Sequence, residues 1–165
     1  DTARHIVRGS AENLASTSLE LGGKSPFIVF EDADLESAAN AQVSGIFAAS
    51  GQSCVAGSRL VVAASVKEAF LAKLKAKAEA VIIGAPDNMA TEVGPLCTAA
   101  QVARAEDIIA RSLAAGAKLV TGGTCLEGAG HYFPPTILDC SAAPDAPRSA
   151  ARSTGCPHSA GTAAR

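Results

Sequence analysis

Two short segments of the chain carry side chains that could do chemistry, and the first holds a carboxylate. It reads LELGGKSP at residues 19–26 and places Glu20 between two leucines, before a pair of glycines. Burying a carboxylate is costly, so burial at the end of an apolar strand would raise the pKa of such a group and suit it to general base catalysis. The glycines would let another group approach the backbone closely. An edge-strand glutamate whose carboxylate reaches water is the alternative that these residues leave open.

The second segment holds a cysteine in a loop of small residues. It reads FAASGQSCVAGS at residues 47–58, and Cys54 follows the expected end of a helix. A thiolate is a strong nucleophile, and small neighbours would leave room for a substrate beside the sulfur. A buried and inert cysteine is the alternative, because that is a common fate of a free cysteine.

The elements around these segments alternate between strands and helices, which predicts an α/β fold with a mostly parallel sheet flanked by helices. Asp32 and Asp34 are candidate N-caps for the helix that leads toward Cys54. Two prolines, at 134 and 135, indicate an edge strand. The apolar spacing predicts helices at 4–14, from Leu35 to near Ser50-Gly51, at 66–81 and at 102–113, and strands at 18–21, 27–30, 59–63, 118–121, 132–133 and 136–138.

Composition narrows the class of protein. The 165 residues carry a net charge of −2 and are 48% hydrophobic, which favours one globular domain and excludes a strongly basic nucleic-acid binder. Residues 37–58 carry no charge but contain too many polar side chains for a membrane span. Residues 144–165 lack large aliphatic side chains, so we expect this tail to be disordered.

The cysteines and histidines form no metal or disulfide pattern. Five cysteines are scattered without a CxxC pair, and the three histidines are isolated, so we expect no metal site. No charged segment leads into an apolar one at the start of the chain, and we expect no signal peptide. Reduced thiols and a cytoplasmic location follow as expectations. Cys97, Cys125 and Cys140 have no nearby base motif and are interpreted as structural.

Together the two segments resemble the glutamate and cysteine signatures of the aldehyde dehydrogenase superfamily. Glu20 and Cys54 lie 34 positions apart, which is similar to the family's spacing. The resemblance continues through SRLVV at 58–62, EVGPL at 92–96 and HYFPPT at 131–136, and covers about residues 2–139.

The resemblance implies a mechanism. Cys54 would attack an aldehyde to form a thiohemiacetal, its backbone N–H would help hold the oxyanion, and hydride transfer to NAD or NADP would leave a thioester. Glu20 would activate the water that releases a carboxylic acid. Leu21 and Gly22 are candidate cofactor contacts by the same resemblance, which also implies a small aldehyde substrate, homo-oligomers, and no nucleic-acid or membrane partner.

The chain departs from the family in length. Members are about three times as long, so we expect residues 1–22 to be the end of a dinucleotide-binding domain, 23–143 a partial catalytic domain, and 144–165 a tail unlike the family. We expect the 165 residues alone to be inactive. A truncated, non-catalytic remnant and an acylating or semialdehyde dehydrogenase, in which coenzyme A takes the acyl group, are the alternatives.

Overall fold

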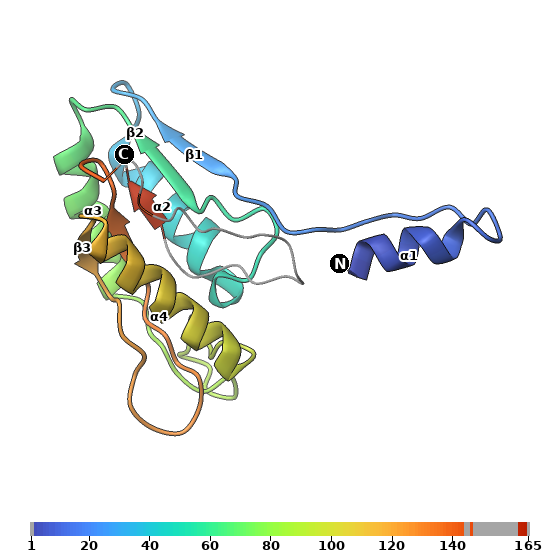
Figure 1. Cartoon of the computed structure of the whole chain (residues 1–165). Helices are drawn as coiled ribbons and strands as arrows, with labels where there is room; N and C mark the ends of the chain where they lie inside the picture. The colour runs from blue at the N-terminus through green and yellow to red at the C-terminus, as the bar shows by residue number, and fades with distance from the viewer. Residues whose placement is uncertain (1, 144–145, 147–161, 165) are drawn as a thin grey trace.

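A five-stranded sheet forms the centre of the protein (Figure 1). The computed structural model describes residues 2–143, 146 and 162–164. The strand order is β1-β2-β5-β4-β3, and every neighbouring pair is parallel except β3 and β4. The mostly parallel sheet predicted from the sequence is confirmed. The strands are β1 (Pro26–Val29), β2 (Arg59–Val62), β3 (Lys118–Thr121), β4 (Ile137–Asp139) and β5 (Thr162–Ala164).

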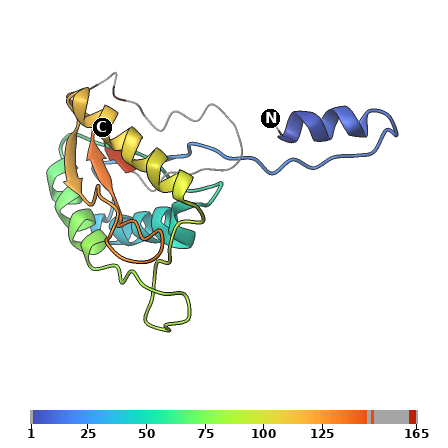
Figure 2. The same ribbon diagram turned by 60° about the horizontal axis from the view of Figure 1, so that its bottom comes forward.

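Helices cover both faces of this sheet (Figure 2). Successive side chains of β4 point to opposite faces, as strand geometry requires. Ile137 packs with the residues of α2 and α3, whereas Leu138 packs with those of α4. The sheet therefore separates two apolar cores. The helices and the short turn are α1 (Thr2–Ser10), α2 (Leu35–Phe47), η1 (Ala48–Gly51), α3 (Lys67–Glu79) and α4 (Ala99–Ala114).

The helix that leads toward Cys54 begins as the sequence predicts. The carboxylate of Asp34 accepts a hydrogen bond of 2.8 Å from the backbone N–H of Ser37, so Asp34 is the N-cap of α2. Burial of Ala39, Ile46 and Phe47 then fixes this helix against the first core. The predicted helices at 66–81 and 102–113 correspond to α3 and α4.

The first 25 residues lie mostly outside this packed body. The helix α1 has no buried residue and stands away from the sheet at the end of an extended segment (Figure 1). Residues 11–22 are all exposed. We call residues 11–25 the arm. The helix expected at 4–14 thus ends at Ser10, and its apolar side has no partner among the described residues.

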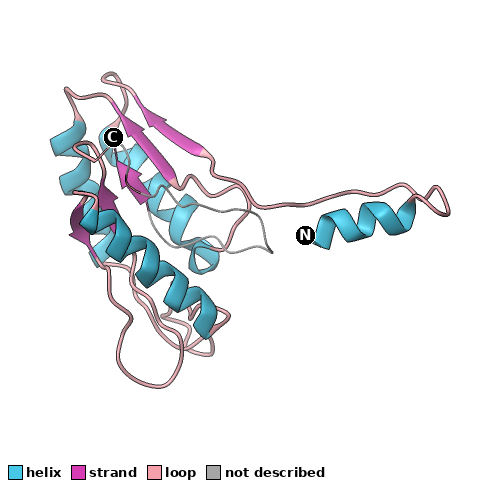
Figure 3. Cartoon of the chain, viewed as in Figure 1, coloured by secondary structure: helices cyan, strands magenta, loops and turns pink. Residues whose placement is uncertain are grey.

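Three strand predictions need correction (Figure 3). Residues 18–21 form no strand, because no described strand lies beside them to pair with their backbone. Residues 132–133 form no strand either, since Pro134 and Pro135 follow them and cannot donate hydrogen bonds. The strand after the prolines, β4, is not at an edge, because it pairs with β5 on one side and β3 on the other.

Within the tail that the sequence predicts to be disordered, the structure describes residues 146 and 162–164. Thr162–Ala164 forms β5 and occupies the middle of the sheet, where it pairs with β2 and β4. Residues 144–145, 147–161 and 165, which include Cys156 and His158, lie outside the described residues. No helix in the described part of the chain is long and apolar enough to cross a membrane.

Candidate active site

Cys54 lies in an exposed turn directly after a left-handed bend of the backbone. Ala49 (φ 51°, ψ 36°) and Ser50 (φ 55°, ψ 34°) both adopt the left-handed conformation inside η1, and Gly51 follows with φ 72°. Residues with a Cβ rarely adopt this conformation. The bend turns the chain out of α2 and presents Cys54 at the surface, so this cysteine is exposed rather than buried.

The C-terminal side of the Cys54 loop is packed against the first core. Ala56 is buried, and the amide of the buried Gln42 donates a hydrogen bond of 2.8 Å to the carbonyl oxygen of Gly57. A Cβ atom added to Gly57 would lie 3.1 Å from the Cβ atom of Phe27. Only glycine therefore fits here without displacing β1, and the loop enters β2 in one fixed register.

The N-terminal side is tied to the loop that follows α3. The Ser50 hydroxyl donates to the carbonyl oxygen of Gly94 at 2.9 Å, and the Gln52 amide donates to the sulfur of Cys97 at 3.3 Å. These two contacts could not be predicted from local sequence patterns, because they join residues 44 and 45 positions apart. Cys97, interpreted from the sequence as structural, is in fact exposed beside the Cys54 loop.

The structure brings the end of the arm against the Cys54 loop. A Cβ atom added to Gly23 would lie 3.1 Å from the carbonyl oxygen of Cys54. Arg59 fixes the next residues, because its Nε donates to the carbonyl oxygen of Lys24 at 2.7 Å and its backbone N–H to that of Ser25 at 3.2 Å. The two segments singled out from the sequence therefore meet at Gly23 and Cys54.

Glu20 lies three residues before this contact and is exposed. The burial expected from its leucine neighbours is not observed, since Leu19 and Leu21 are exposed as well and no described side chain covers them. Among the described residues Glu20 has no hydrogen bond or ion pair. Glu20 is thus only three residues from Gly23, which contacts the Cys54 loop, but no contact within the described part of the chain holds its side chain in place.

Leu21 and Gly22, the candidate cofactor contacts, are exposed on the same extended backbone. The exposed apolar side chain of Leu21, followed by Gly22, which has no side chain, would let a flat ring approach the backbone. These two residues are therefore compatible with a nicotinamide cofactor, although they offer no charged group to hold its phosphates.

The perturbed carboxylates lie away from Cys54 and serve the fold. Partial burial opposes ionisation of Asp139, but hydrogen bonds from Lys67, at 2.6 Å, and from Ser141 outweigh it and hold the pKa of Asp139 below its ordinary value. Hydrogen bonds from Lys77 and Lys73 lower the pKa of Glu36 in the same direction.

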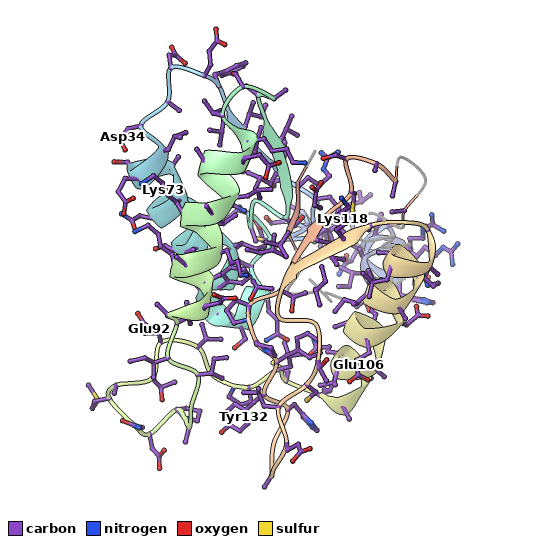
Figure 4. All side chains as sticks on the ribbon, turned by 90° about the vertical axis from the view of Figure 1, so that its left-hand side faces the viewer. Asp34, Lys73, Glu92, Glu106, Lys118 and Tyr132 are labelled. Atoms are coloured by element: carbon purple, nitrogen blue, oxygen red, sulfur yellow. The ribbon has the colours of Figure 1, made fainter. Side chains whose placement is uncertain are left out.

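Figure 4 labels several polar side chains of the packed body. Asp34 and Lys73 lie on the adjacent helices α2 and α3, whereas Glu92 and Tyr132 lie toward the end of the molecule where the loops gather. The carboxylate of Glu92 accepts a 2.8 Å hydrogen bond from the backbone N–H of Ile82, so it stabilises the loop after α3. The described residues contain no group of three or more His, Cys, Asp or Glu that could hold a metal ion.

A model of the aldehyde dehydrogenase family matches residues 1–146 of the chain. Among curated proteins, a (Z)-2-((N-methylformamido)methylene)-5-hydroxybutyrolactone dehydrogenase of Acinetobacter baylyi is 59% identical over 146 residues, which are 88% of this chain and 30% of that protein. Betaine aldehyde dehydrogenase 1 of Rhizobium meliloti is 44% identical over 140 residues, 83% of this chain and 29% of that protein.

Solved structures agree with the sequence comparison. The NAD+ complex of an aldehyde dehydrogenase from Bacillus cereus is 34% identical and superimposes with a TM-score of 0.86, covering 99% of this chain and 32% of that one. The chain thus spans about a third of the length of the relatives that it matches.

Proposed function

Because the chain belongs to the aldehyde dehydrogenase family, we propose that it supplies the catalytic cysteine for NAD(P)+-dependent oxidation of an aldehyde to a carboxylic acid. The observation that carries the proposal is the placement of Cys54. Its thiol is exposed in a loop of small residues, and hydrogen bonds fix that loop on both sides. A nucleophile needs this combination of access and fixed geometry.

Cys54 would carry out the bond-forming step. Its thiolate attacks the carbonyl carbon of the aldehyde, a C–S bond forms, and the carbonyl oxygen becomes an oxyanion. The backbone N–H of Cys54 would stabilise that oxyanion, since a preorganised donor acts most strongly where charge develops. Loss of hydride then leaves a thioester on Cys54.

The cofactor, when bound, accepts the hydride. Leu21 and Gly22 would contact it, because they lie on the exposed backbone just before the Gly23–Cys54 contact. We also propose that the protein works in the reducing environment of the cytoplasm, because the four described cysteines are all free thiols.

Glu20 would act on the thioester. As a base it would take a proton from the attacking water, which releases the carboxylic acid and restores the thiol. The carboxylate of Glu20 is exposed in this structure. The role therefore requires a form of the protein in which this carboxylate lies beside Cys54. If no form of the protein brings Glu20 to Cys54, the chain is a non-catalytic remnant. If coenzyme A rather than water takes the acyl group from Cys54, the enzyme is an acylating or semialdehyde dehydrogenase.

The relatives narrow the substrate class. The Acinetobacter baylyi protein, at 59% identity, is named for a 5-hydroxybutyrolactone, and the Rhizobium meliloti protein, at 44%, for betaine aldehyde. A 5-hydroxybutyrolactone is a cyclic hemiacetal ester whose ring opens to an aldehyde and a carboxylate. We therefore propose an aldehyde that also carries a carboxylate as the substrate, rather than one that carries a quaternary ammonium group.

A segment exchange tests the proposal. Residues 1–146 of this chain replace the matching segment of the Acinetobacter baylyi enzyme, and NAD+ and NADP+ reduction is measured with the hydroxybutyrolactone and with betaine aldehyde. We expect reduction with the lactone that disappears in Cys54→Ser. A folded exchange protein that is inactive, or activity that survives Cys54→Ser, would contradict the proposal. The 165-residue chain by itself is expected to reduce neither cofactor.

A further inference from the structure

The backbone before Cys54 is held in a conformation that its residues do not favour. Ala49, Ser50 and Gly51 are three successive residues with positive φ, and the first two carry a Cβ. Such a conformation persists only where surrounding contacts impose it, and it is found mainly at functional sites.

Two side chains from this bend reach one short segment of the chain. The Ser50 hydroxyl donates to the Gly94 carbonyl oxygen at 2.9 Å, and the Gln52 amide donates to Cys97 at 3.3 Å. We call residues 94–97 the clamp segment. It contacts the bend on either side of Gly51, which is buried and lies between the two hydrogen-bonding residues in the chain.

The clamp segment and Val93, the residue before it, are together anchored in both apolar cores. Val93 belongs to the core of α2 and α3, and Leu96 to the core of α4. The backbone N–H of Leu96 donates to the carbonyl oxygen of His131 at 2.8 Å, and that of Gly84 donates to the carbonyl oxygen of Val93 at 3.2 Å. The segment therefore cannot move with the bend, and it can hold the bend in its unfavourable conformation.

We propose that Ser50 is a positioning residue for Cys54, and that its hydrogen bond to Gly94 fixes the bend which orients the Cys54 backbone N–H and sulfur. The inference rests on the proposed function of Cys54 as a nucleophile. Removal of the hydroxyl leaves the left-handed backbone without its compensating contact. The bend then relaxes, and the donor for the oxyanion moves away from its place while the thiol stays accessible.

The test separates nucleophilic acylation from simple thiol alkylation in the full 165-residue chain. In acylation by p-nitrophenyl acetate, the Cys54 sulfur bonds to the acetyl carbon and p-nitrophenolate leaves with the electron pair. This step develops an oxyanion and needs the positioned N–H. Alkylation by iodoacetamide displaces iodide and develops none. Peptide mass spectrometry assigns each product to Cys54 rather than to another cysteine.

We expect Ser50→Ala to slow acylation of Cys54 about 10-fold, because misplacement of reacting groups by a fraction of an ångström has effects of this size. Alkylation should change less than about 2-fold, because a thiolate that remains exposed keeps its reactivity. Ser50→Asn should restore most of the acylation, since asparagine tolerates positive φ and its amide can donate to Gly94. Ser65→Ala is the matched control, because Ser65 also loses one side-chain hydrogen bond, to Glu31, away from the loop.

Hydrogen–deuterium exchange gives a second readout that does not depend on chemistry. In Ser50→Ala the peptide over residues 47–58 should exchange faster, while α3 exchanges as in the unaltered chain. Acylation that Ser50→Ala leaves unchanged would overturn the positioning role alone. Equal losses of acylation and alkylation with faster exchange throughout would overturn it too, as general unfolding. Absence of acylation at an alkylatable Cys54 in the unaltered chain would overturn the proposed function and this inference together.

Discussion

The Cys54 loop and the arm that carries Glu20 are held by the protein in opposite ways. The loop is tied by side-chain hydrogen bonds at Gly57 and Gly94 and packs on a buried core. The arm is exposed from residue 11 to residue 22 and touches the loop only at its end, through Gly23. Local packing thus holds Cys54, the proposed nucleophile, in place, whereas among the described residues no comparable contacts hold Glu20, the proposed general base.

The largest effect is expected from the loop side of this comparison. In the segment-exchange protein, Cys54→Ser should lower kcat by about 10³-fold or more, because a hydroxyl is a far weaker nucleophile than a thiolate. Steady-state NAD(P)+ reduction measures it. Cys125→Ser is the control, since Cys125 contacts the Tyr132 carbonyl oxygen in a different loop and should leave kcat within about 2-fold. Equal losses in both variants would contradict the special role of Cys54.

A change in the arm should affect the full catalytic cycle but not the acylation of Cys54 alone. Glu20→Gln should slow turnover of the segment-exchange protein by about 10²-fold, since loss of a general base costs this much. It should leave acylation of Cys54 in the 165-residue chain unchanged, because Glu20 is exposed and unpaired there. Glu12→Gln, in the same exposed arm, is the control for both assays. An acylation rate that falls in Glu20→Gln would show that the two regions are coupled more tightly than the structure indicates.

The ion pair between Lys67 and Asp139 lies in the packed body, so breaking it measures the stability of that body independently of the arm. The side chains of Lys67 and Asp139 are 17% and 16% exposed, so Asp139→Asn should lower the free energy of unfolding by about 1–3 kcal/mol at neutral pH. Denaturant unfolding measures it. Asp107→Asn breaks the exposed pair with Arg111 and should cost less than about 0.5 kcal/mol.

The pH dependence of the same variant follows from the direction of its pKa shift. The pKa of Asp139 is lower in the folded protein than its ordinary value of 3.8, so the carboxylate stabilises the fold at higher pH. That contribution is lost as the pH falls below about 4 and through the folded-state pKa. The difference in unfolding free energy between the unaltered chain and Asp139→Asn should therefore shrink in that range. A difference that is constant with pH would contradict an ionised pair.

The smallest effect is expected where the two regions meet. Gly23→Ala places a Cβ 3.1 Å from the Cys54 carbonyl oxygen, so the loop must shift by a few tenths of an ångström. Acylation of Cys54 should slow by about 3-fold to 10-fold, since reacting groups are sensitive to small displacements. Gly45→Ala is the control, because an added Cβ there meets no atom and should stabilise α2 by about 0.5–1 kcal/mol. The same acylation rate in both variants would mean that the contact between Gly23 and the Cys54 carbonyl oxygen does not affect the position of Cys54.

Much of the fold could be predicted from local patterns, and the failures have physical causes. Apolar spacing and the Asp34 cap placed α2, and apolar runs placed β1, β2 and β3 to within about a residue. The central strand β5 was missed because backbone pairing, rather than side-chain hydrophobicity, defines it. The strand at 18–21 was wrong because its apolar pattern has no described partner strand.

The candidate site divides in the same way. The resemblance of two segments to the family signatures singled out Cys54, whose own neighbours left an inert cysteine open, and the structure places it in an exposed loop of small residues. The left-handed bend was missed because alanine and serine give no signal for positive φ. The exposure of Glu20 was missed because two leucine neighbours predicted burial, which only a covering element could provide.

One measurement tests the central claim most directly, which is that Cys54 forms a covalent intermediate with the substrate. The segment-exchange protein with Glu20→Gln is mixed with the hydroxybutyrolactone and NAD+, quenched with acid and digested, and the Cys54 peptide is weighed by mass spectrometry. A peptide heavier by the acyl group of the oxidised substrate, seen only with NAD+ present, is the result that we predict. An unmodified Cys54 during turnover, or the acyl group on another cysteine, would contradict the claim.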